Sequence, residues 1–160
     1  MQMDEPLDEE GLRKKDNVLE ALQQIKTADF TELKTMRNPV VGVAQIIVFT
    51  GELLLGSPCD VRKSLQELMC KPKTFIELSL GLEDRLDAQQ LKVLQEIRKA
   101  QIDIEAVRRK SQAAYGLALW LTALVDFSHH SGLIQKAKFV PTVKRREEAR
   151  KGWQYTTNAD

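Results

Sequence analysis

Cysteine and histidine are scarce in this chain of 160 residues, which holds two of each. Two thiols, Cys59 and Cys70, cannot build a disulfide framework or a four-ligand zinc site. His129 and His130 are adjacent, so on a helix their side chains point about a hundred degrees apart and cannot chelate one metal ion. We therefore expect inert cysteines, no metal and no cofactor.

The chain also lacks the usual signatures of catalysis. It has no phosphate-cradling GxxxxGK(S/T) or GxGxxG loop, no HExxH zinc motif and no GxSxG nucleophile elbow. Paired acids such as Glu83 and Asp84 fit a solvated surface rather than an acid–base site. The sequence therefore predicts a protein that acts by binding and is not an enzyme.

Long hydrophobic runs are absent as well. The most apolar stretch, residues 39–55, is shorter than the ~20 residues that a membrane span needs, and Gln45, Thr50 and Glu52 interrupt it. No basic segment followed by an apolar one opens the chain, so no secretory signal is visible. With 29% charged residues and a net charge of +1, we expect a soluble cytoplasmic protein without a nucleic-acid or membrane partner.

What the chain does contain is a series of helical patterns separated by short breaks, with no strand alternation and no internal repeat. The pattern predicts an all-α bundle. Asp29 and Glu32 resemble a capping box, Asp60 and Asp87 can cap helices, and Pro72 ends one.

The expected helical segments are residues 8–26, a turn at 33–36, and residues 38–55, 60–71, 74–78, 87–97 and 111–131. Residues 103–109 form a connector, and helical character resumes over residues 133–151. In the first segment the apolar stripe consists of Leu12, Val18, Leu19, Leu22 and Ile25.

The segment 38–56 carries the clearest helix signals. Asn38 suits an N-cap, Pro39 suits the first helical position, and Gly56 can take the left-handed conformation that closes a helix. The body between them is apolar on nearly every side, which indicates a helix buried inside the bundle.

The two ends of the chain carry opposite charge. Residues 1–20 hold seven acids and three bases, whereas residues 136–151 hold seven bases and two acids. The two ends attract each other if they run side by side; the alternative is two independently solvated helices.

Two blocks of the sequence resemble the microtubule-binding stalk head of dynein heavy chains. The first runs from Ile25-Lys26 through Leu33-Lys34-Thr35-Met36-Arg37-Asn38-Pro39 to Leu55-Gly56. The second is Ser111-Gln112-Ala113-Ala114-Tyr115-Gly116-Leu117-Ala118-Leu119-Trp120, with Phe127 seven residues after the tryptophan. Asp60, Arg62-Lys63 and Phe75 fall where that family has its second and third helices, and Pro141 resembles the proline that begins the returning strand.

The resemblance covers roughly residues 19–145 and implies a small helical head at the tip of an antiparallel two-stranded coiled coil. It places the first strand and entry turn at 8–35, the head at 36–131, the returning strand at 132–151 and a disordered tail at 152–160. It further implies non-catalytic, reversible docking on α/β-tubulin, with the coiled coil joining the head to the rest of a heavy chain. Docking on acidic tubulin is electrostatic. The expected setting is the cytoplasm and cytoskeleton, with the axoneme of a cilium or flagellum as the alternative.

The sequence departs from the family pattern at four positions. Val40 stands where a second proline is usual, Ala44 and Leu119 stand where the family has basic residues, and Val61 replaces a tryptophan. The spacing from Trp120 to Pro141 is also longer, with residues 128–132 as the inserted stretch. The departures at Ala44 and Leu119 remove positive charge near elements that face tubulin in the family.

Eight cations remain as candidates for a tubulin contact, with Lys34 first because the family has basic residues there; the alternative is that each is a solvated surface charge. They are Lys34, Arg37, Arg62, Lys63, Lys71, Lys73, Lys136 and Lys138. Two other functions stay open. One is a dynein-like structural module that has lost strong microtubule binding and serves assembly or another axonemal partner. The other is a helical adaptor unrelated to dynein.

Overall fold

A computed structural model describes residues 7–36, 38–56 and 58–134, and these residues are helical with no strand. The chain divides into two compact units, Met1–Phe127 and Ser128–Asp160. The prediction of an all-α bundle is confirmed. In the second unit, the described residues finish helix α8 (Gln112–His130) and turn at Gly132, which has a φ of 77°. No helix within the described ranges is long and apolar enough to cross a membrane.

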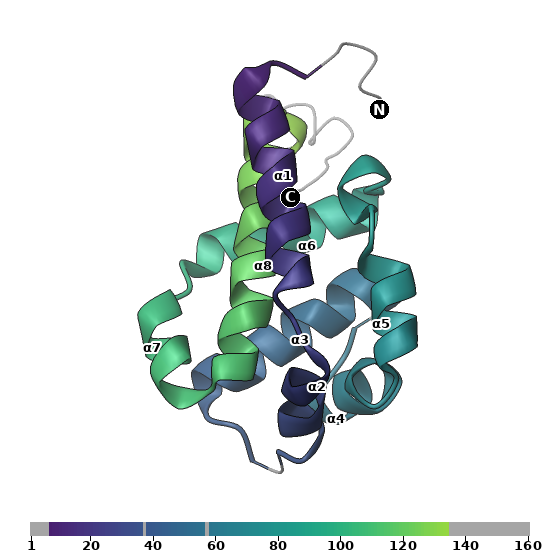
Figure 1. Cartoon of the computed structure of the whole chain (residues 1–160), viewed down its shortest axis with the longest axis vertical. Coiled ribbons are helices and arrows are strands. Elements are labelled where there is room, and N and C mark those ends of the chain that lie inside the picture. Colours follow the sequence, from purple (N-terminus) through teal and green to yellow (C-terminus); the bar gives the residue numbers. More distant parts are fainter. Residues whose placement is uncertain (1–6, 37, 57, 135–160) are drawn as a thin grey trace, which may run out of the picture. The chain divides into compact units, whose positions relative to one another are not determined.

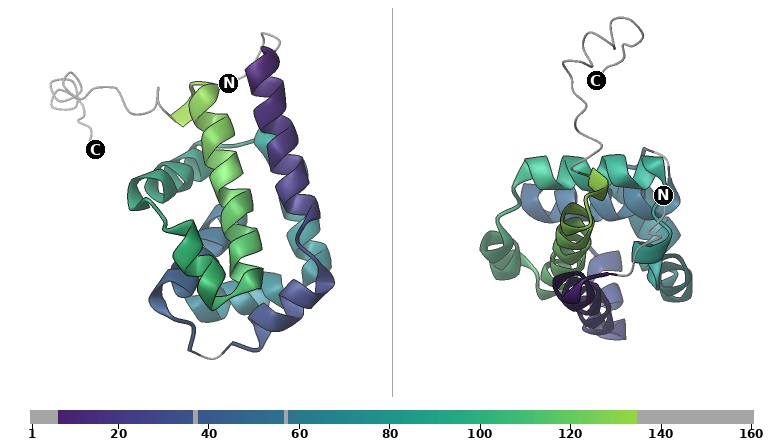
Figure 2. Two further views of the ribbon diagram at one scale, coloured as in Figure 1. Left: turned by 60° about the vertical axis from the view of Figure 1, so that its left-hand side comes forward. Right: turned by 90° about the horizontal axis from the view of Figure 1, so that it is seen from above.

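Helix α1 (Glu9–Gln23) lies beside the part of α8 that belongs to the first unit and runs in the opposite direction (Figures 1 and 2). Val18, Leu22 and Ile25 are buried, as expected, but Leu12 and Leu19 are 52% and 40% exposed. Leu12 follows the buried Gly11, and Leu19 follows the buried Val18. Because each residue turns a helix by about 100°, both leucines point away from the buried face of α1. Near the end of α1, the Ile25 side chain lies 3.7 Å from where a Cβ on Gly116 would stand.

Helix α3 (Val41–Leu55) occupies the centre of the first unit, which confirms the prediction of a buried helix. Its C-terminus is closed by Gly56 at φ 72°, as predicted. Five segments pack against it: α4 (Val61–Ser64), the π-helical segment η1 (Leu65–Met69), α5 (Pro72–Ser79), α6 (Ala88–Ala100) and α7 (Ile104–Lys110).

The predicted start of this helix is wrong. Its N-cap is Val40, in an extended conformation with no side-chain hydrogen bond, so Asn38 and Pro39 precede the helix. The first turn closes through the backbone alone, since the Ala44 N–H donates to the Val40 carbonyl at 2.8 Å. Helix α3 thus begins at the point where it meets α7, and contact with another helix has outweighed the local capping signal.

The other capping predictions hold with one correction. The Asp60 and Asp87 carboxylates each accept the backbone N–H three residues on, from Lys63 and Gln90, at 2.8 Å. Asp29 is not an N-cap. It occupies the third position of α2 (Thr27–Lys34), where its carboxylate accepts the Lys26 N–H at 2.8 Å, so the helix begins three residues earlier than a cap at Asp29 would place it.

Two segments are more helical than the sequence suggested, and a third differs in the kind of helix. The apolar piece at 74–78 belongs to the full helix α5, which Pro72 begins at a position where no amide hydrogen is required. The expected connector at 103–109 is α7, capped by Asp103, whose carboxylate accepts the Ala106 N–H at 3.1 Å. The stretch after Asp60 widens into the π-helical turns of η1, which bury its two leucines and its methionine.

An aromatic cluster joins three helices at the core. Phe75 on α5 is fully buried, with its ring centroid 5.2 Å from that of Phe30 on α2 and 5.7 Å from that of Trp120 on α8. Both pairs are edge-to-face, the geometry that aromatic quadrupoles favour. The cluster fixes α2 and α5 against the helix that carries Trp120.

Candidate functional site

The predicted cations that the structure describes are all exposed and lie on neighbouring elements. Lys34 ends α2, Arg62 and Lys63 lie in α4, and Lys71 and Lys73 flank the start of α5. We call these five residues the α2–α5 basic surface. The other three candidates, Arg37, Lys136 and Lys138, lie outside the described residues.

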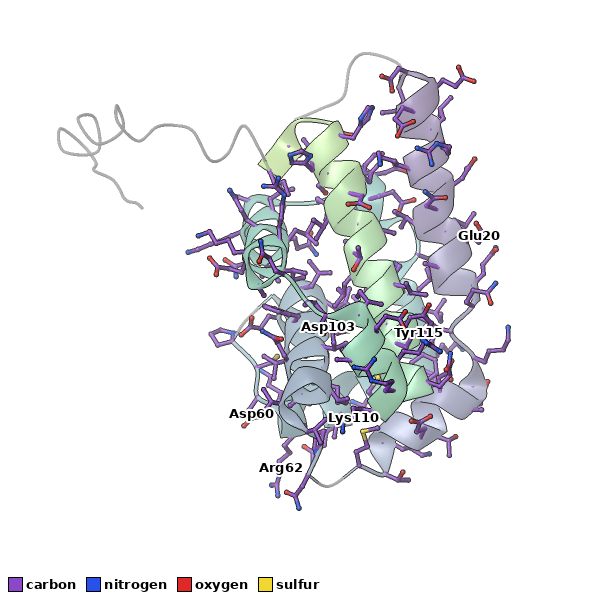
Figure 3. The ribbon with its side chains drawn as sticks, turned by 90° about the vertical axis from the view of Figure 1, so that its left-hand side faces the viewer. Glu20, Asp60, Arg62, Asp103, Lys110 and Tyr115 are labelled. Atoms are coloured by element: carbon purple, nitrogen blue, oxygen red, sulfur yellow. The ribbon has the colours of Figure 1, made fainter. Side chains whose placement is uncertain are left out.

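Packing brings these elements together. Helix α2 packs against η1, which continues α4 and leads into α5. Figure 1 places α2 and α4 at the end of the first unit opposite the start of α1. In Figure 3, Arg62 projects at that same end, whereas Glu20 on α1 lies nearer the other end. The start of the acidic first helix and the α2–α5 basic surface therefore lie at opposite ends of the first unit.

The cations of this surface differ in how far they are already neutralised. The Lys71 ammonium lies 3.6 Å from the Glu67 carboxylate. Lys34, Arg62 and Lys73 have no ion-pair partner among the residues that the structure describes. A cation without a partner is free to pair with an acidic surface, so these three residues are the best candidates for an electrostatic contact.

Sequence reasoning missed a second basic cluster, the last turn of α7, which holds Arg108, Arg109 and Lys110. Arg108 binds the Glu105 carboxylate at 2.6 and 3.0 Å, and its guanidinium carbon lies 6.0 Å from the centre of the Tyr115 ring. Because Arg108 donates these hydrogen bonds to the Glu105 carboxylate, its pKa is raised. The signal was present in the sequence, since Asp103 can cap a helix and three bases suit its last turn.

The positions where the sequence departs from the dynein pattern are open to solvent to different degrees. Val40 is 49% exposed, and Ala44, Val61 and Leu119 are half-buried. Ala44 lies in the second turn of α3, whose start packs against α7, and Leu119 immediately precedes the buried Trp120. A long basic side chain at Ala44 or Leu119 could therefore extend its charged end into solvent.

One hydrogen bond ties the beginning of α8 to α2. The Ser111 hydroxyl donates to the Glu32 carboxylate at 2.7 Å and also accepts the Ala114 N–H at 3.0 Å. Ser111 therefore caps α8, as its position predicts, and fixes that cap to a residue 79 positions away.

Groups suited to chemistry do not gather anywhere in the described part of the chain. No set of three His, Cys, Asp or Glu residues there could hold a metal ion. Burial raises the pKa of the Cys59 thiol, which favours its protonated and less nucleophilic form. Cys70 is free and exposed. The arrangement offers charged and apolar contact surfaces.

No protein-family model matches the chain, and no solved structure gives a significant match. Two curated proteins do match. Dynein heavy chain domain-containing protein 1 of Homo sapiens is 29% identical over 149 residues, 84% of this chain and 3% of that protein. Dynein heavy chain-like protein 2 of Plasmodium falciparum (isolate 3D7) is 27% identical over 126 residues, 68% of this chain and 2% of that protein. The chain thus spans only a few hundredths of the length of these proteins. Its sequence is similar, at the level of a divergent relative, to proteins of the dynein heavy chain type.

Proposed function

We propose that this chain is a non-catalytic module that docks reversibly on microtubules, in the manner of a dynein stalk head. The observation that carries the proposal is the similarity to dynein-type proteins over 84% of the chain. Two features of the structure support it. The first is the antiparallel pair of α1 and α8, and the second is the α2–α5 basic surface at the end remote from the start of α1 (Figure 1).

The docking contact rests on charge. Tubulin presents an acidic surface, and exposed cations steer and orient a partner on such a surface. Lys34 and Arg62 lie on neighbouring elements without ion-pair partners among the described residues, so they can meet carboxylates without breaking an existing pair. Binding of this kind weakens as salt screens the charges.

Microtubule cosedimentation tests this proposal. The double variant Lys34→Ala/Arg62→Ala is expected to bind roughly tenfold more weakly than the natural chain, because each exposed ion pair contributes about 0.2–1 kcal/mol and 1.4 kcal/mol is tenfold. The matched control removes two cations from α6, Lys92→Ala/Lys99→Ala, and should keep its affinity. Equal losses in both variants, full binding at several hundred millimolar salt, or no binding by the natural chain at any salt would contradict the proposal.

A second candidate function is favoured by Ala44 and Leu119, which stand where cations occur in the dynein pattern. In that case the chain keeps the fold of a docking head but serves assembly or another axonemal partner. The variant Ala44→Lys/Leu119→Lys separates the two functions in the same assay. If strong binding has been lost, the two lysines should raise microtubule affinity by roughly tenfold or more, since each adds one ion pair. If the natural chain already binds through the α2–α5 basic surface, the gain should be less than threefold.

A further inference from the structure

Helix α1 carries a second stripe of regularly spaced side chains, separate from its buried face. Its members are Glu9, Leu12, Asp16 and Leu19, so the two acids and the two leucines each repeat at an interval of seven residues. Because each residue turns a helix by about 100°, these four side chains lie within about 80° of one another around α1. All four are exposed, Leu12 to 52% and Leu19 to 40%. We call these four residues the outer stripe of α1.

Contacts on the inner side of α1 fix how the helix is turned about its axis. Val18 and Leu22 are buried, and the Lys15 ammonium lies 2.9 Å from the Asp84 carboxylate on the short helical turn η2 (Leu82–Asp84). Figure 2 shows α1 at the edge of the first unit in both views. A rotation that buried the outer stripe would expose the inner apolar side chains and break this ion pair, so the outer stripe faces solvent.

The two acids of the outer stripe are available for a contact. Glu9 and Asp16 have no ion-pair partner among the residues that the structure describes. The cations of α1 pair with other carboxylates, Arg13 and Lys14 with Glu10, and Lys15 with Asp84. The outer stripe thus combines two unpaired carboxylates with two exposed leucines.

Leucines that repeat every seven residues, accompanied by charges at the same interval, are typical of a helix that packs along another helix. We propose that the outer stripe of α1 binds an amphipathic helix of a partner protein, one that carries Leu or Ile at seven-residue intervals with Lys or Arg between them. The apolar residues of the partner cover Leu12 and Leu19, and its cations pair with Glu9 and Asp16. Charge complementarity selects a basic partner.

Two other occupants fit the outer stripe less well. A second copy of this chain, packed stripe against stripe, would bring carboxylates close together, and like charges repel. The basic end of the same chain, residues 136–151, supplies cations but few apolar side chains. Five of its seven bases follow Pro141, and between Pro141 and residue 152 the apolar residues are Val143 and Ala149.

This inference does not depend on microtubule docking, because it concerns different residues and a ligand of opposite charge. The test measures fluorescence anisotropy of labelled helical peptides added to the full chain. The Leu–Lys peptide has three heptads with Leu and Lys on one face, the second peptide has each Lys replaced by Glu, and the third has each Leu replaced by Gln. We expect the Leu–Lys peptide to bind at least tenfold more tightly than the other two. Its affinity should fall as salt is raised, because salt screens exposed ion pairs.

Two variants assign the binding to the outer stripe. Leu12→Gln/Leu19→Gln is expected to weaken the Leu–Lys peptide at least tenfold, because two apolar contacts are lost while glutamine forms a helix about as readily as leucine. Glu9→Gln/Asp16→Asn should weaken it about threefold to tenfold, since two exposed ion pairs are lost. The matched controls change exposed residues elsewhere and should leave the affinity unchanged; they are Leu80→Gln and Glu77→Gln/Glu96→Gln.

Circular dichroism of each variant separates loss of binding from loss of fold. The proposal is overturned if the Leu–Lys peptide does not bind, if its Glu counterpart binds equally well, or if the control variants lose as much affinity as the test variants. It is also overturned if Arg145→Glu/Arg146→Glu raises the peptide affinity tenfold, because the basic end of the same chain would then cover the outer stripe. A natural chain that sediments as a dimer, and as a monomer after Leu12→Gln/Leu19→Gln, would assign the stripe to a second copy and overturn it too.

Discussion

Replacing Phe75 by alanine is expected to lower the free energy of unfolding by about 3–5 kcal/mol, the range for truncating a large buried aromatic side chain. The Phe75 ring is fully buried and makes edge-to-face contacts with both Phe30 and Trp120. Each such contact adds about 0.5–1.5 kcal/mol beyond burial of area, so the loss should fall in the upper part of that range.

Urea unfolding followed by circular dichroism measures this effect, and tryptophan fluorescence adds a local probe because Trp120 lies against Phe75. Phe75→Leu is a matched control that keeps most of the volume and should lose less than Phe75→Ala. Phe49→Ala is a second control, because Phe49 on α3 is only half-buried and its truncation should also be milder. A loss below about 1 kcal/mol for Phe75→Ala would mean that the aromatic cluster does not join α2, α5 and α8 as described.

Gly51→Ala should destabilise the protein by about 1–3 kcal/mol, although alanine is normally the better helix former by about 1 kcal/mol. Gly51 lies within α3 where α4 crosses it. A Cβ there would stand 2.8 Å from both Cβ and Oγ of Ser64 and 3.1 Å from Sγ of Cys59. The Ser64 hydroxyl is itself fixed, because it donates to the Ile47 carbonyl at 2.8 Å within the core.

Gly42→Ala is the matched control for this substitution, since it lies on the same helix. A Cβ at Gly42 would meet Val107 at 3.8 Å, an ordinary contact distance. Thermal unfolding should therefore show opposite signs: a lower midpoint for Gly51→Ala, and an equal or higher one for Gly42→Ala. Two shifts of the same sign would rule out a close crossing of α3 and α4 at Gly51.

Signals that act within one turn of the chain could be predicted from the sequence. The caps at Asp60, Asp87 and Ser111 and the left-handed Gly56 each depend on a residue and its near neighbours, so they are visible without knowing the fold. The central position of α3 could also be predicted, because a helix that is apolar on nearly every side must be covered by other elements.

Features set by contacts between distant segments could not be predicted in this way. Helix α7 has seven residues, too few to display a helical period, so its cap and its basic last turn were visible in the sequence but its packing against α3 was not. The start of α3 is likewise set where it meets α7 rather than at the strong cap residue Asn38.

The α2–α5 basic surface was partly predictable. Lys34 and Arg62 were identified by position, and the structure places Lys34 on α2, which packs against η1, the continuation of the helix that carries Arg62. The residues alone could not indicate which cations are already neutralised. Lys71 is paired with Glu67 one helical turn away, whereas Lys34 and Lys73 have no such pair among the described residues. That distinction needs the conformation of the side chains.

The hydrogen bond between Ser111 and Glu32 has a consequence for how such a module can sit within a longer protein. It holds together two points that are 79 residues apart in sequence, one near the end of α2 and one at the start of α8. A domain whose entry and exit are adjacent can be inserted into a host chain without forcing the flanking segments apart. The segment between Glu32 and Ser111 therefore begins and ends at one place, and changes of sequence within it can leave the spacing of α1 and α8 unaltered.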